Sequence, residues 1–233
     1  MIVGLVGFIG AGKGTVADLL VDRHDFVKES YANSVKDACA TIFGWNRNML
    51  EGDTPGSRAW REQDDKWWSE KLGKPFSPRL ALQLMGTEAG RDVFHPDLWV
   101  HTVMRRCEQA PWHNYVIADV RFPNEINAIR NSGGKVIRVR RGDEPEWYQL
   151  AYDCNTFNQQ HVMRERYPDV HYSEWAWVGQ FTDITMDNNC DLDTLTVRVD
   201  RLVDSLYNNR VEANEVVNYG PIVTGKQIGR AHV

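Results

Sequence analysis

The chain has 233 residues, of which 42% are hydrophobic and 25% charged, and its net charge at pH 7 is −5. This is the composition of a globular protein that can bury a substantial core, and the acidic balance argues against a protein that binds a nucleic-acid polymer over its whole surface. No apolar run reaches the length of a membrane span, so a membrane is not expected as a partner.

The four cysteines of the chain, at positions 39, 107, 154 and 190, are far apart and form no C-x-x-C pair. This spacing argues against a disulfide framework and against a cysteine-based zinc site. It favours a reducing compartment, and we therefore expect a cytoplasmic protein.

The chain begins with an apolar strand at residues 2–6, and a glycine-rich turn follows before an apolar helix at 16–21. The turn contains the pattern G-x-x-x-x-G-K from Gly7 to Lys13, in the strand–turn–helix context that a phosphate-binding loop requires. Backbone N–H groups and the positive end of the helix dipole bind phosphate oxygens at such a loop. Lys13 is predicted to reach the outer phosphates. The hydroxyl that holds Mg²⁺ is assigned to Thr15, because Gly14 occupies the usual position directly after the lysine.

Short elements with candidate cations come next. Residues 26–29 indicate a strand, and Asn33 or Ser34 is a plausible N-cap for a helix that ends near Phe43. Lys36 falls in the first turn of that helix, where either a bound anion or plain solvation would accommodate its charge. Residues 57–72 are expected to form one helix. Arg58 and Arg61 share a face of it and could bind a phosphate or pair with nearby acids.

Two further helices are predicted between residues 77 and 109. Ser77 and Pro78 form a typical helix start, and Gly86 is expected to end or interrupt the helix. Asp97 is expected to cap the next helix, which runs to about Gln109.

The strand predicted at residues 114–120 carries Asp119 near its carboxyl end, and Arg121 follows it. Ligands of open α/β sheets bind at the carboxyl ends of strands, so both side chains should face the same crevice as the first loop. Asp119 could hold Mg²⁺ directly or through water, bind a sugar hydroxyl, or cap the next helix. The strand at 135–141 leaves Arg140 and Arg141 near this crevice.

Residues 142–180 show weak periodicity and are interpreted as an insertion or lid. A last strand at 182–187 and an amphipathic helix at 191–206 complete the pattern, and residues 208–233 are interpreted as a disordered or artefactual tail. His95 with His101, and His161 with His171, lack a clean metal spacing, so no zinc site is predicted. His171 is instead expected to form hydrogen bonds within the lid.

These elements predict an α/β protein with a P-loop NTPase-type three-layer fold. It has a mostly parallel central sheet, helices on both faces, and helical and lid insertions. We expect a single domain at residues 1–207, with an acceptor-binding insertion at about 44–112 and a lid at about 142–180.

In this order, the short motifs of the chain resemble those of the phage-type deoxynucleoside monophosphate kinases over about residues 1–206. The most selective are L-M-G-T-E, D-x-W-V and D-V-R-F-P-N-E. The matching stretches are residues 7–15, 32–38, 79–88, 97–100, 119–121 with Glu125, and 171–174.

The resemblance implies transfer of the γ-phosphoryl group of ATP to a deoxynucleoside 5′-monophosphate with Mg²⁺, in DNA precursor synthesis. A phage-encoded enzyme would act in the host cytoplasm, and a homodimer is possible because related kinases are often dimers. The resemblance assigns ATP binding to Gly10, Ala11, Gly12, Lys13, Gly14 and Thr15. It assigns acceptor binding to Lys36, Arg61, Arg79, Gly86, Thr87, Trp99, Asp119, Arg121 and Glu125, and catalysis to Lys13, Asp119, Arg121 and Arg141.

Two other functions stay open at this point. One is a P-loop kinase of a different small acceptor, of the dephospho-coenzyme A or adenylate type. The other is a nucleotide-binding module without catalysis, which the many cations beyond the loop disfavour because a simple switch needs no second phosphate site.

Overall fold

The computed structural model describes residues 1–208, and the tail interpreted as disordered or artefactual lies outside them except for Asn208, which ends the last helix. The core is a five-stranded sheet in the order β2-β3-β1-β4-β5, and every neighbouring pair of strands is parallel. The strands are β1 (Ile2–Val6), β2 (Phe26–Glu29), β3 (Asn114–Ile117), β4 (Lys135–Arg140) and β5 (Ile184–Asp187). This confirms the predicted α/β fold of the P-loop type.

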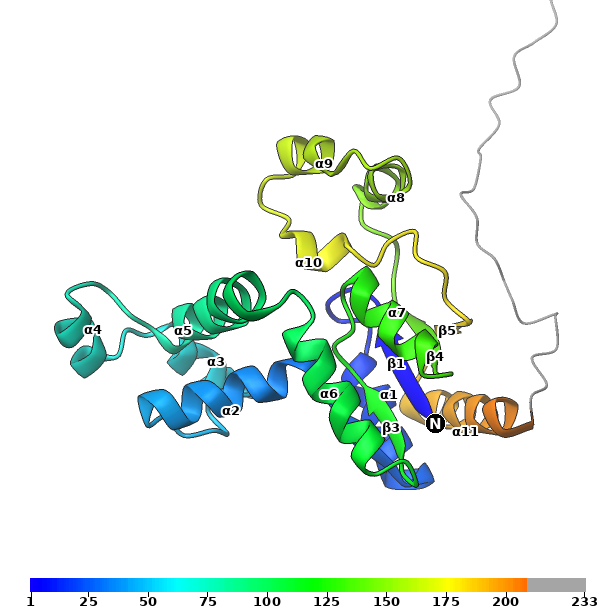
Figure 1. Cartoon of the computed structure of the whole chain (residues 1–233). Helices are drawn as coiled ribbons and strands as arrows, with labels where there is room; N and C mark the ends of the chain where they lie inside the picture. The colour runs from blue at the N-terminus through cyan, green and yellow to red at the C-terminus, as the bar shows by residue number, and fades with distance from the viewer. Residues whose placement is uncertain (209–233) are drawn as a thin grey trace, which may run out of the picture.

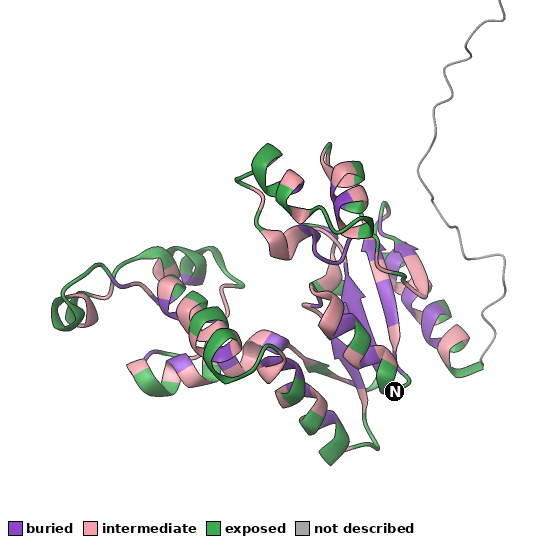
Figure 2. Cartoon of the chain, turned by 45° about the horizontal axis from the view of Figure 1, so that its top comes forward, coloured by how far each residue is buried: buried purple, intermediate pink, exposed green. Residues whose placement is uncertain are grey.

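Helices cover both faces of this sheet (Figure 1). Along β1, Val3 and Leu5 pack with α1 (Lys13–His24) and α11 (Leu192–Asn208), whereas Ile2 and Val6 pack on the other side with α6 (Leu98–Gln109) and α7 (Pro123–Asn131). This alternation follows from the two-residue period of a strand. Figure 2 shows the buried residues concentrated in the strands and on the helix sides that face them.

A helical arm projects from one side of the sheet (Figure 1). It has its own small apolar core, which includes Trp45, Leu50 and Phe76, and Trp99 of α6 joins that core to the main body. The arm consists of α2 (Tyr31–Phe43), α3 (Pro55–Glu62), α4 (Lys66–Leu72), α5 (Pro78–Leu84) and the π-helix η1 (Met85–Phe94).

The stretch interpreted as a lid folds into three short helices, α8 (Tyr148–Thr156), α9 (Gln160–Arg166) and α10 (Tyr172–Trp175). They stand beyond the carboxyl ends of the strands (Figure 1). Met163 and Trp175 are fully buried in the same cluster as α6 and α7. Phe8 of the first loop also contacts the lid, because its ring centroid lies 4.9 Å from that of Trp177.

Several predicted element boundaries were wrong, and the strands predicted at 114–120 and 182–187 are shorter, at Asn114–Ile117 and Ile184–Asp187. Residues 57–72 form two helices, because Asp65 caps α4 by accepting the N–H of Trp68 (3.0 Å). The helix expected to start at Asn33 or Ser34 begins at Tyr31, with Ser30 as its N-cap. Lys36 therefore lies in the second turn of α2. The helix expected to end or break at Gly86 continues as η1, with the wider π-helical turn.

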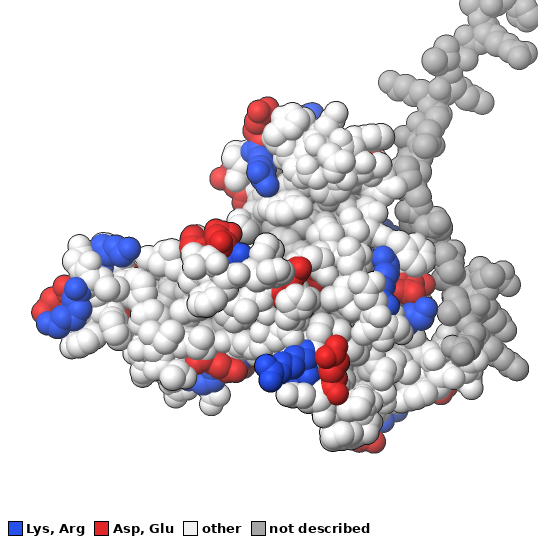
Figure 3. All heavy atoms as spheres, viewed as in Figure 1, with Lys and Arg blue, Asp and Glu red and all other residues white. Residues whose placement is uncertain are grey.

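Charged side chains form separate small groups on the face shown in Figure 3, with acidic and basic residues next to each other. Ion pairs on the structure include Arg106 with Glu29 (2.7 Å) and Arg23 with Asp200 (2.8 Å). None of the helices within residues 1–208 combines the length and the apolar character needed to cross a lipid bilayer.

We predict that Gly134→Ala destabilises the protein by about 1–3 kcal/mol, the usual cost of overpacking a core. A Cβ at Gly134 would lie 2.6 Å from the backbone oxygen of Ile2 and 2.8 Å from that of Ile129, and backbone atoms cannot move aside cheaply. The measurement is the free energy of unfolding in urea. Gly56→Ala is the control, since Gly56 is exposed in α3 and its nearest neighbouring atom would be 4.0 Å away. Equal effects of the two substitutions would contradict the prediction.

Candidate active site

Asn188, which directly follows the edge strand β5, holds the glycine-rich loop in place. Its buried side chain donates from Nδ2 to the carbonyl of Ala11 (2.8 Å), and its backbone N–H donates to the carbonyl of Arg140 (2.7 Å). Gly12 is in the left-handed region (φ 92°), and a Cβ there would lie 2.2 Å from the Asn188 amide. Glycine is therefore required at position 12 both by its backbone angle and by its close neighbour. The sequence analysis missed Asn188, although its place at the carboxyl end of a strand is the signal that identified Asp119.

Lys13 opens α1 and folds back over the loop. Its Nζ donates to the carbonyls of Gly7 (2.7 Å) and Phe8 (3.0 Å). The pKa of Lys13 is lowered to about 8, mainly by burial and also by the positive charge of Arg121, while Glu174 and Asp119 act in the opposite direction. The loop lysine thus shares an electrostatic environment with the two residues predicted at the end of the β3 strand.

A cavity of about 680 Å³ lies between the arm, the carboxyl end of β3 and the lid. Eight of the predicted acceptor residues line it, and these are Lys36, Arg61, Gly86, Thr87, Trp99, Asp119, Arg121 and Glu125. Arg79, the ninth, is exposed on α5 and does not line the cavity, and neither does Arg141, which is exposed directly after β4. The sequence analysis did not select several other lining residues, and these include Tyr31, Glu51, Arg91 and Phe122.

The carboxylate of Asp119 binds the start of α2. Its Oδ1 accepts the N–H of Tyr31 (3.1 Å), and its Oδ2 accepts the hydroxyl of Ser30 (2.7 Å) and the N–H of Ala32 (3.2 Å). A negative charge at a helix N-terminus is stabilised by the free N–H groups and the dipole there. Asp119 therefore caps α2, which lies far before it in the chain, and not the following helix that was expected as an alternative.

Glu125 of α7 is 2% exposed and holds three segments together. Its Oε2 accepts the N–H groups of Arg121 (2.7 Å) and Phe122 (3.0 Å), and its Oε1 accepts from Arg91 Nη2 of η1 (3.1 Å). Burial raises the pKa of Glu125 to about 7, against the effect of these donors. The guanidinium of Arg91 also lies over the ring of Phe122, 4.9 Å from its centroid.

Arg61 is the cation whose hydrogen-bonding capacity is least used in the cavity. Its Nε is buried and has no hydrogen-bond partner among the described residues, and its Nη1 makes only long contacts with the carbonyls of Leu50 and Glu51. Burial lowers its pKa, and the like charges of Arg79 and Arg58 lower it further. An anion at this point would satisfy a buried donor and relieve repulsion between guanidinium groups.

Lys36 is already paired within the protein. Its Nζ contacts Glu51 Oε2 at 2.6 Å, and Glu51 also pairs with Arg47. These two cations lower the pKa of Glu51 even though burial of the carboxyl acts in the opposite direction. Lys36 therefore needs no bound anion to account for its position, and a phosphate there would share the lysine with Glu51.

Trp99 forms one wall of the cavity at the junction of α6 with η1. It is 8% exposed, and its Nε1 donates to the carbonyl of Gly86 (2.8 Å). A Cβ at Gly90 would lie 2.5 Å from the indole ring, so η1 can approach Trp99 this closely only with a glycine there. The indole position is thus fixed from two sides.

The lid reaches the cavity through α10. Arg121 Nη1 donates to Glu174 Oε1 (2.8 Å) and to the hydroxyl of Ser173 (3.2 Å). His171 Nδ1 accepts the N–H of Ser173 (3.2 Å) and lies 2.8 Å from its hydroxyl. The expectation that His171 makes hydrogen bonds within the lid is thereby confirmed.

The donor set around the loop fits a hard cation such as Mg²⁺. Thr15 presents an exposed hydroxyl in the first turn of α1, and Asp119 presents a carboxylate near Lys13. Mg²⁺ commonly keeps several waters and takes one or two protein oxygens in addition to phosphate oxygens. Because both oxygens of Asp119 already accept from α2, contact through water is the arrangement that preserves these bonds.

Two curated viral proteins are similar to this chain, and no family model matches it. A putative deoxynucleotide monophosphate kinase of Acanthamoeba polyphaga mimivirus is 31% identical, over 60% of this chain and 74% of the viral protein. The deoxynucleoside-5′-monophosphate kinase of Escherichia phage T5 is 27% identical, over 57% of this chain and 72% of that protein.

Among solved structures, shikimate kinase from Aquifex aeolicus aligns with 90% of this chain and 98% of its own, at 14% identity and a TM-score of 0.42. A gluconokinase from Sinorhizobium meliloti aligns with 89% of this chain and 96% of its own, at 14% identity and a TM-score of 0.36.

We predict that Glu125 makes the stability of the protein depend on pH. Its pKa is raised to about 7 in the folded state, so folding takes up a proton between the ordinary carboxyl pKa and about pH 7. The contribution of Glu125 to the free energy of unfolding should therefore fall as pH rises from about 4.5 to about 7 and then level off. Glu125→Gln should flatten this dependence in urea unfolding between pH 5 and 8. Glu165→Gln, on the exposed side of α9, is the control. An unchanged slope in Glu125→Gln would refute the assignment.

Proposed function

The chain belongs to the deoxynucleotide monophosphate kinases, and we propose which of its residues bind the donor, bind the acceptor and stabilise the moving phosphoryl group. The activity is the transfer of the γ-phosphoryl group of ATP to a deoxynucleoside 5′-monophosphate. The bond from the γ-phosphorus to the bridging oxygen of ADP breaks, and a bond from that phosphorus to an oxygen of the acceptor phosphate forms. Both named relatives are viral, which supports a role in DNA precursor supply during infection.

On the donor side, the backbone N–H groups from Gly10 to Thr15 and the ammonium of Lys13 would hold the ATP phosphates. The ammonium of Lys13 donates to the carbonyls of Gly7 and Phe8, and these hydrogen bonds fix its charge beside the loop. Mg²⁺, held by Thr15 and through water by Asp119, would neutralise charge on the donor phosphates when it is bound.

On the acceptor side, the observation that carries the proposal is the under-satisfied guanidinium of Arg61 in a cavity that also reaches Arg121. Arg61 would bind the acceptor phosphate, and Lys36 would share it with Glu51. Arg79, next to Arg61 but outside the cavity, would add a longer-range positive potential. Trp99 and Tyr31 line the cavity and would shape the base and sugar pocket, together with Gly86 and Thr87.

Arg121 would act on the moving phosphoryl group, because it lines the acceptor cavity and also influences the charge of Lys13. Phosphoryl transfer depends mainly on positioning and on neutralisation of charge, and it requires no strong general base. Residues 142–180 would close over the site and exclude water. The hydrogen bond from Arg121 to Glu174 would let a movement of the lid change the position of Arg121. Arg141, at the base of the lid, would approach the phosphates on closure.

The proposed organisation is one kinase domain over residues 1–207, with residues 44–112 as the acceptor-binding insertion. The direct test is to supply Mg-ATP with single monophosphates and to follow ADP. Stimulation by deoxynucleoside monophosphates is the expected result. Stimulation only by a dephospho-coenzyme A or adenylate type of acceptor, or nucleotide binding without acceptor-dependent turnover, would favour the other two functions.

We predict that Lys13→Ala lowers kcat by about a hundredfold or more, the usual loss when one preorganised charge donor is removed. The measurement is ADP release with both substrates saturating. Lys71→Ala is the control, because Lys71 is an exposed lysine on α4 that pairs with Glu70. Near-normal turnover by a folded Lys13→Ala protein would remove this lysine from the mechanism.

We predict that Arg61→Ala raises the KM for the monophosphate by about tenfold or more and leaves the KM for ATP nearly unchanged. A hydrogen bond to a charged group contributes about 1.5–3 kcal/mol, which corresponds to this range. Arg79→Ala should have a smaller effect in the same direction, because Arg79 does not line the cavity. Arg201→Ala, exposed on α11, is the neutral control. Equal increases in both KM values for Arg61→Ala would place it outside the acceptor site.

A further inference from the structure

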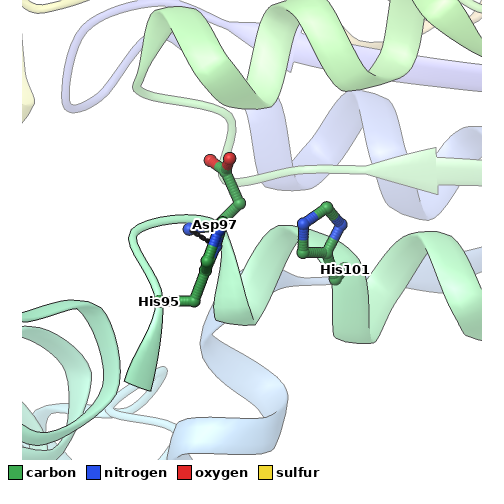
Figure 4. Close-up of side chains that lie close together, drawn as sticks. All are labelled: His95, Asp97 and His101. Carbon is green, nitrogen blue, oxygen red and sulfur yellow. Dashed lines mark hydrogen bonds between the residues drawn. The ribbon is translucent and has the colours of Figure 1, made fainter. Parts of the chain in front are cut away.

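A cluster of three potential metal ligands lies at the junction of η1 and α6, outside the cavity (Figure 4). His95, Asp97 and His101 each offer one ligand atom, and these atoms all lie within 4.8 Å of one another. The spacing of the histidines in the sequence predicted no metal site. The structure nevertheless brings these side chains together, because η1 ends where α6 begins and His95 lies beside the first turn of α6.

The local backbone explains why the three side chains meet. His95 directly follows η1, and its N–H donates to the carbonyl of Gly90 (3.1 Å) as the last hydrogen bond of that helix. The chain then turns into α6. Asp97 and His101 are four residues apart, and the N–H of His101 donates to the carbonyl of Asp97 (2.8 Å). They consequently share one face of the helix, and the ring centroids of the two histidines are 5.5 Å apart.

Asp97 is not used as the helix cap that the sequence suggested, since its side chain makes no capping hydrogen bond. Its Oδ1 instead accepts from Asn124 Nδ2 of α7 at 2.6 Å. A hydrogen bond of this kind orients a ligating carboxylate and leaves the other oxygen available. His95 Nδ1 accepts the N–H of Asp97 (3.0 Å), and this bond orients the ring and leaves Nε2 as the nitrogen that can bind a cation.

We propose that His95, Asp97 and His101 form a binding site for a borderline divalent transition-metal ion, of which Zn²⁺ is the model case. Two imidazoles and one carboxylate suit zinc, cobalt or nickel, whereas Mg²⁺ and Ca²⁺ require mostly oxygen ligands. Ligand atoms around a tetrahedral Zn²⁺ lie about 3.3 Å apart. The ligand atoms, which lie within 4.8 Å of one another, can reach this spacing by small rotations of their side chains, because His95 and His101 are exposed. The fourth position faces solvent and takes a water molecule.

The site would clamp three segments that all contribute to the acceptor cavity. Arg91 of η1, Trp99 of α6 and Glu125 of α7 line the cavity, and the cluster with its Asn124 bond joins the same three elements. The bound ion is thus a structural group and takes no part in phosphoryl transfer.

The test is direct metal binding to the full, tag-free chain in excess Mg²⁺, which occupies sites that prefer oxygen ligands. Titration calorimetry should give one Zn²⁺ per chain, and Co²⁺ as a probe should show the visible absorption of a four-coordinate ion that Zn²⁺ then removes. His95→Ala and His101→Ala should each weaken binding at least tenfold. Asn124→Ala should weaken binding about tenfold, which is the usual effect of losing a supporting hydrogen bond.

The matched control is His113→Ala, an exposed histidine outside the cluster, which should bind Zn²⁺ as the wild type does. His101→Cys should restore binding, because a thiolate is also a zinc ligand. Zn²⁺ should raise the melting temperature of the wild type but not of the His95→Ala/His101→Ala double variant. Absence of Zn²⁺ binding by the wild type, or undiminished binding by a folded double variant, would overturn the proposal. Neither result depends on kinase activity.

Discussion

The buried carboxylate of Glu125 is the constraint on which the walls of the cavity depend. It accepts two backbone N–H groups at the start of α7 and one guanidinium from η1. The backbone carbonyl of Glu125 also accepts a hydrogen bond from the hydroxyl of Tyr31 in α2 (3.4 Å). Burying a carboxylate is costly unless it is paired and hydrogen-bonded, so these donors must stay in place together. The ends of β3, α2 and η1 are thereby fixed around one cavity.

Asp119 has the same role at the opposite end of the short connection between β3 and α7. Both carboxylates that follow this strand bind backbone N–H groups at helix N-termini. This use of acids is compatible with phosphoryl transfer, which depends on positioned cations and N–H groups. Arg91 and Arg121 are paired with Glu125 and Glu174, so Arg61 is the cavity cation whose hydrogen-bonding capacity is least used.

The sequence predicted features that local patterns determine, and it failed where distant segments meet. The loop from Gly7 to Lys13 and the parallel strands could be identified because their spacing and apolar periodicity are local. Asn188 contacts Ala11, 177 positions away in the sequence, and Arg91 contacts Glu125, 34 positions away. No local sequence pattern predicts either contact. The cluster of His95 with His101 was missed because the path of the chain out of η1 is set by tertiary packing against Trp99.

Cations lie close to one another both near Lys13 and near Arg61. Burial is the main cause that lowers the pKa values of Lys13 and Arg61, and nearby cations lower them further, Arg121 for Lys13 and Arg79 with Arg58 for Arg61. Arg121 is paired with Glu174 and Arg79 with Glu62, whereas the buried Nε of Arg61 has no hydrogen-bond partner among the described residues. A phosphate between two such cations replaces repulsion by attraction, and the gain is largest where burial reduces screening by solvent. Such a gain would suit an enzyme that must bind a nucleoside triphosphate and a monophosphate together.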